Sequence, residues 1–214
     1  MLKLIKGIIL FKKIEKHYLV MFLNLLASFF FSNKIYMAAS LNRHYIPGKR
    51  ALLIVLMATF LDDIAYYCFD SKYALSNYSF IFYFLEIVST CFVVALLSRI
   101  VGCSARQCTF SAIFKGYSYT LSPVIFGSIL IIIISLVTDL NNPITHPQSY
   151  KVFYYLTLFV LMVWMFACQY IFFMTYFTSL SVARRFTLFA ISIGIYFGAD
   201  KIKKLTYLFL SGSQ

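Results

Sequence analysis

Long apolar runs, separated by short polar segments, dominate the pattern of this chain. Runs of about 20 residues recur, and this is the length that a helix needs to cross the hydrocarbon core of a bilayer. Within a run the apolar residues are continuous and do not alternate in a two-residue period, so they predict helices and not the strands of a membrane barrel. The predicted spans are residues 51–69, 78–101, 116–137, 152–177 and 186–199.

The last of these runs is short for a crossing. It reaches full length if its helix begins near Leu180, with Arg184 and Arg185 extending to the interface, or if it continues into residues 201–204. A re-entrant segment is the alternative, because it would return Lys201 and its basic neighbours to the side of the other positive charges.

A further apolar run, HYLVMFLNLLASFFF at 17–31, is too short to span a bilayer. We expect it to form a helix in the membrane interface. The sequence therefore predicts an all-α integral membrane bundle of about five transmembrane helices, preceded by an interfacial N-terminal helix. Its regions are a basic, partly amphipathic part at 1–46, a membrane domain at 47–204 and a short tail at 205–214.

Composition and charge support a lipid environment. Of the 214 residues, 62% are hydrophobic and 12% are charged, about half the usual charged share of a soluble domain. The formal net charge is +12, but the lysines and arginines lie at the ends of apolar runs, where they orient helices and contact anionic headgroups. This placement argues against nucleic acid as a partner and predicts a cytoplasmic N-terminus.

The third predicted span begins with unusually polar residues, GYSYTLSP at 116–123. Pro123 cannot donate a helical hydrogen bond and its ring displaces the carbonyl of Tyr119, so the helix should bend there and leave that carbonyl in need of a partner. Gly116 permits a close helix contact. The segment is interpreted either as a proline kink packed on its neighbours or as a hinge or partner-binding notch. We expect the partner of the freed carbonyl to be a nearby hydroxyl, from Ser118, Thr120 or Ser122.

The order GYSYTLSP, then a long aliphatic run, then a fourth span that carries Trp164 and ends in SLSVARRF resembles the Yip domain family, the Ypt-interacting-protein-like membrane proteins. Members of this family have a Tyr-Ser-x-x-Pro-like element in the third span. Bacterial members also have a tryptophan in the fourth span, followed by a Leu-Ser-x-x-Arg-Ala-like turn. The chain departs from the pattern at Arg185, where alanine is usual. The matching positions, within residues 50–200, are Gly116, Tyr117, Ser118, Pro123, Trp164, Leu180, Ser181 and Arg184.

This resemblance implies a five-span bundle with a cytoplasmic N-terminus, in a bacterial inner membrane or in ER or Golgi membranes. It implies a non-enzymatic role in membrane organisation or trafficking, exerted through lipid or protein contacts. The matching residues are then candidates for partner binding or for a hinge. Other membrane proteins are expected partners, whereas a small GTPase is implied only weakly, because a basic region replaces the acidic tail of the eukaryotic members.

Carboxylates inside the predicted spans are a second costly feature. Asp62 and Asp63 lie in the first span and Glu86 lies in the second, all in the half of the bilayer away from the predicted cytoplasmic side. If the two helices are antiparallel neighbours, these carboxylates converge and could share a proton. The acids are interpreted either as structural groups, hydrogen-bonded or at helix ends, or as the working groups of a small ion- or proton-coupled transporter or channel.

Other candidate chemistry is sparse. The histidines, His17, His44 and His146, are far apart in the sequence and fall on different sides of the predicted membrane, so no metal site is expected. The five cysteines match no common zinc or redox spacing and are expected to be free thiols. The sequence has no phosphate-binding glycine loop, nucleophile elbow or zinc-protease motif, so neither a cofactor nor an enzymatic activity is predicted.

Overall fold

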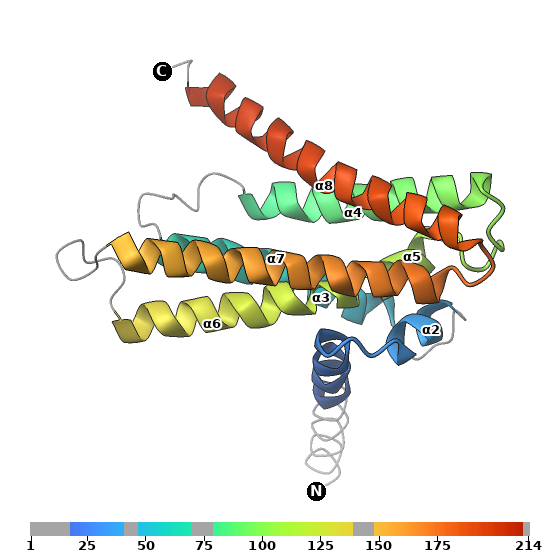
Figure 1. Cartoon of the computed structure of the whole chain (residues 1–214), viewed down its shortest axis with the longest axis horizontal. Coiled ribbons are helices and arrows are strands. Elements are labelled where there is room, and N and C mark those ends of the chain that lie inside the picture. The colour runs from blue at the N-terminus through green and yellow to red at the C-terminus, as the bar shows by residue number, and fades with distance from the viewer. Residues whose placement is uncertain (1–17, 41–46, 70–78, 139–147, 212–214) are drawn as a thin grey trace, which may run out of the picture.

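Every regular element in the described part of this computed structural model is a helix. The structure describes residues 18–40, 47–69, 79–138 and 148–211 (Figure 1). Among these residues, five helices are long and apolar enough to cross a membrane, and a shorter apolar helix precedes them at Tyr18–Phe29. The predicted class, a helical membrane bundle of about five spans with an N-terminal helix before it, is confirmed. Residues 1–17 and 41–46 of the basic N-terminal region lie outside the described residues, and residues 1–17 carry five of its seven lysines and arginines.

The third span is composite, and the others in the described part of the chain are single helices. The third begins at Phe110, and not at residue 116 as the sequence predicted, because Thr109 caps its first turn. The threonine hydroxyl accepts a hydrogen bond from the Ala112 amide at 3.3 Å. The spans are α3 (Gly48–Phe69), α4 (Ser79–Ile100), the third span made of α5 (Phe110–Tyr117), the 3₁₀ turn η2 (Ser118–Leu121) and α6 (Ser122–Thr138), then α7 (Gln148–Tyr176) and α8 (Val182–Ser211).

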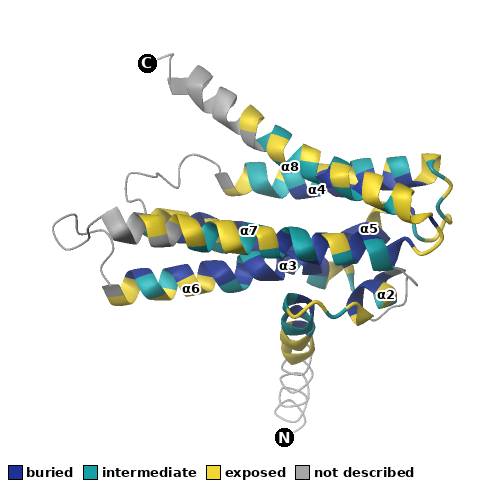
Figure 2. Cartoon of the chain, viewed as in Figure 1, coloured by how far each residue is buried: buried dark blue, intermediate teal, exposed yellow. Residues whose placement is uncertain are grey.

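The five spans form a closed ring. Helix α3 packs on α6, α6 on α7, α7 on α8, α8 on α4, and α4 returns to α3. At one end of this ring α5 lies between α3, α4 and α7, and η2 continues from it against α3 and α7. Every residue from 116 to 123 is buried there (Figure 2). The interior of the ring is therefore filled by the first half of the third span at this end.

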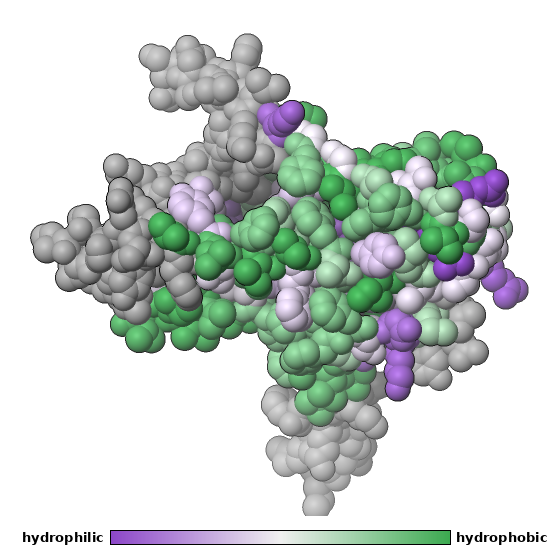
Figure 3. Space-filling model, viewed as in Figure 1, coloured by the Kyte–Doolittle hydropathy of each residue, from purple (hydrophilic) through white to green (hydrophobic). Residues whose placement is uncertain are grey.

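The outward faces of the spans are apolar. Phe60 on α3, Phe92 on α4, Val137 on α6 and Phe159 on α7 are all exposed. Most of the strongly hydrophilic side chains in the space-filling view lie near the end of the molecule that carries α5 and the connection from α7 to α8 (Figure 3). Such a surface is stable in the hydrocarbon core of a bilayer, because its apolar side chains are not exposed to water there.

Helix α8 resolves the question of the short fifth run. It is one continuous helix from Val182 to Ser211, so it extends beyond the predicted run at both ends and passes through Lys201. This continuity leaves no place for a re-entrant turn. Towards its C-terminus α8 diverges from the other spans (Figure 1). No heavy atom lies within 4 Å of the position that a Cβ would take at Gly194 or Gly198, so this face of α8 is not packed against the bundle.

The N-terminal helix (Tyr18–Phe29) runs crosswise to the spans (Figure 1). It packs on the bundle through Met21, Leu25 and Ser28, which lie on one face and are buried. A short helix that the sequence did not predict, α2 (Lys34–Ser40), follows it and packs on α5 and α7. Seven residues carry too few apolar positions for a periodic signal, which is why α2 was missed.

Gly116 marks a close contact between α5 and its neighbours. A Cβ at this position would lie 2.5 Å from Cε2 of Phe172 and 3.3 Å from Cβ of Ala39. The Phe172 ring is fully buried and is held among other aromatic rings, so it cannot swing aside. Only glycine therefore fits without moving the α5–α7 contact.

We expect Gly116→Ala to lower the melting temperature of the detergent-solubilised protein, because overpacking at such a site costs about 1–3 kcal/mol. Gly194→Ala is the matched control: its Cβ meets open space, and the gain in helix propensity is worth up to about 1 kcal/mol. Thermal unfolding followed by circular dichroism checks both variants. Equal melting temperatures would contradict this packing.

Candidate functional site

A hydrogen bond from the N-terminal helix meets the third span where Pro123 interrupts it. The 3₁₀ turn η2 comes directly before Pro123, and the carbonyl oxygen of Tyr119 accepts from the Ser122 amide three residues on. The same oxygen accepts a second hydrogen bond from the Ser28 hydroxyl, at 2.8 Å. The carbonyl that Pro123 removes from the helical pattern is thus bound by a residue 91 positions away in the chain.

The expectation that a local hydroxyl would serve this carbonyl is wrong. Ser118 donates to the Lys115 carbonyl at 3.0 Å, and Thr120 donates to the Tyr117 carbonyl at 2.7 Å. Both are bonds to the preceding turn, which serine and threonine commonly make within helices. The hydroxyl of Ser122 is buried without a hydrogen-bond partner among the described residues.

Ser28 is itself held by Tyr36 of α2. Their hydroxyl oxygens are 2.6 Å apart. Burial raises the pKa of Tyr36 well above its ordinary value, so the phenol keeps its proton at every physiological pH. Tyr36 can therefore donate to Ser28 while Ser28 donates to Tyr119, and the three groups form one buried chain of hydrogen bonds.

The C-terminus of the N-terminal helix is closed by a turn at Phe31. The Ser32 amide bonds to the Ala27 carbonyl at 2.9 Å and the Phe31 amide bonds to the Ser28 carbonyl at 3.0 Å, the pattern of a Schellman motif. Phe31 has a φ of 61°, a conformation in which glycine is usual and a large side chain is strained. The exit of this helix is therefore fixed in one direction.

Trp164 of α7 supports the strained turn. Its ring stacks on Phe29 at 5.4 Å and on Phe31 at 4.9 Å between ring centroids. Its indole Nε1 donates to the Phe29 carbonyl at 2.8 Å, and the Cys168 thiol lies 3.5 Å from the Ser28 carbonyl. These contacts supply donors to carbonyls at the helix end that lack helical partners.

The connection from α7 to α8 is held by two arginines. Ser181 caps α8 by accepting from the Arg184 amide at 3.5 Å, and Arg184 Nη1 donates to the Val101 carbonyl at 2.8 Å. The Arg185 guanidinium donates to carbonyls at the end of α7 and in the turn that follows, those of Met174, Thr178 and Leu180, at 2.8–2.9 Å. Arg185, the departure from the family pattern, therefore fixes the direction in which α8 leaves α7.

The same corner contains Cys103 and Gln107, from the segment between α4 and α5. Gln107 Nε2 donates to the Tyr176 carbonyl at 3.2 Å, and the Tyr176 hydroxyl donates back to the Gln107 carbonyl at 3.0 Å. Partial burial, together with a hydrogen bond to Cys108, raises the pKa of the Cys103 thiol to about 11. Cys103 is therefore a protonated, weakly reactive thiol at neutral pH.

A half-open cavity of about 550 Å³ lies inside the ring of spans. All five spans contribute to its walls, and most of the lining side chains are apolar. The polar ones include carboxyl, phenol and hydroxyl groups. We call this space the ring cavity, and its lining residues are Asp62, Phe82, Tyr83, Leu85, Glu86, Ser89, Val124, Ser128, Ile131, Leu158, Leu161, Met162, Met165, Ile195, Tyr196, Gly198, Ala199 and Ile202.

The structure brings two of the three intramembrane acids together at this cavity. Asp62 on α3 and Glu86 on α4 both line it, whereas Asp63 is buried at 3% exposure and does not contribute to the lining. Tyr83 lines the same cavity, and its hydroxyl donates to Met165 Sδ at 3.9 Å. The arrangement can attract and hold a positive charge inside an apolar space.

The residues of the family resemblance lie elsewhere. Gly116, Tyr117, Ser118 and Pro123 form the buried third-span segment, Trp164 supports the end of the N-terminal helix, and the pair Ser181 and Arg184 orders the turn before α8. Their contacts connect one part of the chain to another, and none of them lines the ring cavity. Within the described residues, no group of three or more His, Cys, Asp or Glu side chains is placed to hold a metal ion.

Sequence reasoning missed Ser28, Tyr36 and Phe31. A single serine in an apolar run carries no signal of a partner 91 residues away. The positive φ of Phe31 is equally invisible, because phenylalanine is not a residue that predicts such a turn.

Comparisons of the chain with protein-family models, with curated proteins and with solved structures found no match. The resemblance to the Yip domain family therefore rests on the quoted residues. The assignment as a multispan membrane protein rests on the spans themselves.

We expect Ser28→Ala to loosen the N-terminal helix, because it leaves Tyr36 without its buried partner and removes one of the bonds to the Tyr119 carbonyl. The cost is about 1–3 kcal/mol. Ser192→Ala is the matched control, since this buried hydroxyl bonds only within its own helix, to the Phe189 carbonyl at 2.7 Å. Hydrogen exchange of residues 18–29 in detergent is the measurement. Faster exchange in Ser28→Ala alone is predicted. The same exchange rate in both variants would contradict the role given to the hydrogen bonds of Ser28 in holding this helix.

Proposed function

We propose that this multispan membrane protein is non-enzymatic and acts in membrane organisation, through the contact that its N-terminal helix makes with lipid. One observation carries the proposal: an apolar helix is fixed crosswise to five membrane-spanning helices (Figure 1). The role agrees with the one that the resemblance to the Yip domain family implies.

The outward face of the N-terminal helix is as apolar as its packed face. Its exposed residues are Tyr18, Leu19, Val20, Phe22 and Leu23. A helix that lies on water needs a polar outer face, whereas a helix that is apolar all round is stable only when its surroundings are apolar. We infer that this helix lies within the lipid of one leaflet, in the membrane plane.

Such a helix adds volume to one leaflet without a matching addition to the other. The hydrogen bond from Ser28 to the Tyr119 carbonyl and the stacked rings of Trp164 and Phe31 hold the helix to the bundle. The orientation of the helix therefore follows that of the spans. In-plane helices bind in a manner sensitive to curvature and lipid composition. The protein is therefore suited to impose or stabilise curvature where it gathers.

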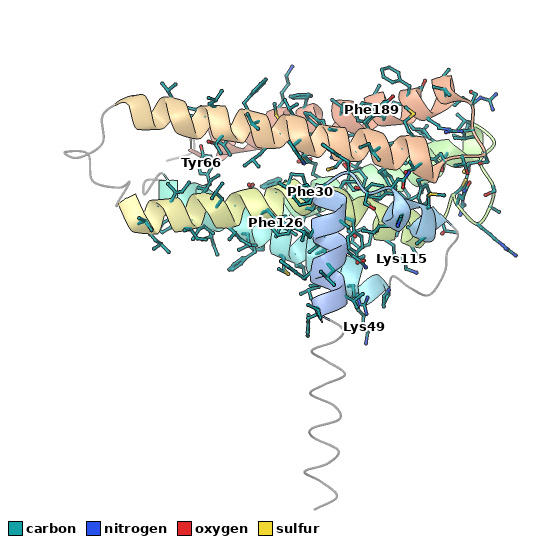
Figure 4. The ribbon with its side chains drawn as sticks, turned by 60° about the horizontal axis from the view of Figure 1, so that its bottom comes forward. Phe30, Lys49, Tyr66, Lys115, Phe126 and Phe189 are labelled. Carbon is teal, nitrogen blue, oxygen red and sulfur yellow. The ribbon has the colours of Figure 1, made fainter. Side chains whose placement is uncertain are left out.

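Basic side chains accompany the N-terminal helix. Lys34 and Lys49 are exposed, and Lys49 and Lys115 lie on the side of the bundle from which this helix extends (Figure 4). Each basic group near an anionic surface adds about 1 kcal/mol of attraction. Anionic headgroups and other membrane proteins are the partners that we propose, whereas a small GTPase partner has only the family resemblance in its favour.

Reconstitution into vesicles tests the proposal. At high protein-to-lipid ratio, the wild-type protein is expected to yield smaller vesicles or tubules than protein-free lipid, as measured by electron cryomicroscopy. The triple variant Leu19→Gln, Val20→Gln, Leu23→Gln should lose this effect, because a polar outer face no longer enters the leaflet, while the buried Met21, Leu25 and Ser28 and the contact of Phe22 with Phe126 are untouched.

The matched control is the apolar triple variant Leu19→Ile, Val20→Leu, Leu23→Ile, which should behave as the wild type does. Vesicles that keep the shape of protein-free lipid in the presence of the wild-type protein, at equal and verified insertion, would remove the proposal.

A second candidate function is supported by the position of Asp62 and Glu86 in one cavity. Paired carboxylates within a bundle are typical of small ion- or proton-coupled transporters and channels. Against it, the opposite end of the ring interior is filled by α5 and η2, so a pathway would require this end to open.

Proton flux into liposomes with an entrapped pH dye tests this second function. A transporter is expected to show flux that Glu86→Gln abolishes and Glu86→Asp retains, because aspartate keeps the titratable group. The absence of flux at both acid and neutral pH would rule it out.

A further inference from the structure

We propose that the ring cavity binds a long-chain ammonium amphiphile, with the ammonium head beside Asp62 and Glu86 and the chain along the apolar wall. This inference concerns the interior of the ring and does not depend on the proposed action of the N-terminal helix on membrane shape. The cavity has about 550 Å³, within the range of about 300–1,000 Å³ that small-molecule sites occupy.

The polar groups in the cavity lining fit a cation. Asp62 and Glu86 come from adjacent helices, α3 and α4, and Ser89 and Ser128 add hydroxyl groups to the same lining. A bound ammonium group is attracted to both carboxylates, and this attraction is strong where water is scarce. The rings of Tyr83 and other aromatic residues in the lining offer further favourable surfaces to a cation.

The rest of the lining requires an apolar partner. Val124, Ile131, Leu158, Leu161 and Met165, from α6 and α7, add apolar, uncharged side chains to the lining. A small hydrated cation would leave this surface in contact with water, whereas a hydrocarbon chain covers it and gains the free energy of apolar burial. The mixed lining therefore favours an amphiphile over a free ion.

The charge of the carboxylates also selects among amphiphiles. A phosphate headgroup would bring a negative charge to the side of the cavity that already holds Asp62 and Glu86, and like charges repel strongly in an apolar site. A fatty acid is disfavoured for the same reason. An ammonium group without a neighbouring phosphate is the head that the site fits best.

Helix α8 provides the entrance. Gly198, Ala199 and Ile202 of α8 line the cavity, and α8 diverges from the other spans towards its C-terminus (Figure 1). At Gly198, no heavy atom lies within 4 Å of where a Cβ would be placed. Because the outer faces of the spans contact lipid, a membrane-dissolved amphiphile can reach the cavity sideways on this side of the ring.

A series of ligands with one tail and different heads tests the site on the wild-type chain. Octadecylamine, octadecanol and octadecanoate are titrated into the detergent-solubilised protein, and bound copies are counted by native mass spectrometry. Octadecylamine should bind at least about 10-fold more tightly than the other two, the ratio expected for a charge-assisted contact. Equal binding of octadecanol or octadecanoate overturns the proposal. So does full displacement of octadecylamine by an equal concentration of tetramethylammonium, which would make this a site for soluble cations.

Neutralising variants locate the site. Glu86→Gln and Asp62→Asn should each weaken octadecylamine binding by about 10-fold or more, and Glu86→Asp should largely preserve it. Asp63→Asn is the matched control, because it removes a carboxyl from the same helix without altering the lining. Unchanged binding in both Glu86→Gln and Asp62→Asn, or an equal loss in Asp63→Asn, overturns the assignment. Size-exclusion profiles verify that each variant remains folded.

Discussion

The bond from the Ser28 hydroxyl to the Tyr119 carbonyl joins the crosswise helix to the membrane bundle, and the placement of that helix depends on it. Pro123 makes this bond possible, because it removes the helical donor that would otherwise occupy the carbonyl. The Tyr119 carbonyl also accepts from the Ser122 amide, and the Ser28 hydroxyl supplies its second hydrogen bond in a place where no water is present to do so. The interruption of the third span and the docking of the N-terminal helix are thus two parts of one arrangement, and each stabilises the other.

The interruption of the third span at Pro123 also separates two parts of the ring interior. On one side, α5, η2 and the buried rings around Phe172 fill the space between the spans. Beyond Pro123, α6 returns to the ring wall and leaves the ring cavity open to Asp62 and Glu86. The interior thus holds two sets of polar groups at separate places. Ser28 and Tyr36 form hydrogen bonds beside Tyr119, and Asp62 and Glu86 line the ring cavity. A chain with few charged residues therefore combines an apolar outer surface, which lipid covers, with an interior cavity that two carboxylates line.

The length and continuity of the apolar runs were enough to predict the spans, because a bilayer admits few alternatives. The start of the third span was not predictable in the same way: it was predicted at residue 116, yet α5 begins at Phe110 and continues directly into η2. The partner of Tyr119 was misassigned since hydrogen bonds between distant segments leave no local pattern. The meeting of Asp62 with Glu86, and the exclusion of Asp63, depend on how α3 and α4 are rotated, which helical periodicity does not determine when a helix is apolar on all sides.

The depth of the N-terminal helix in the membrane tests the central claim most directly. Spin labels placed singly at positions 19, 20, 22 and 23 in the reconstituted protein report their accessibility to oxygen, which dissolves in lipid, and to a water-soluble nickel complex. A helix that lies in the plane of one leaflet predicts high oxygen accessibility, low nickel accessibility and similar depth at all four positions. Strong nickel accessibility at these positions, or a depth that changes steadily along the helix, would contradict the account.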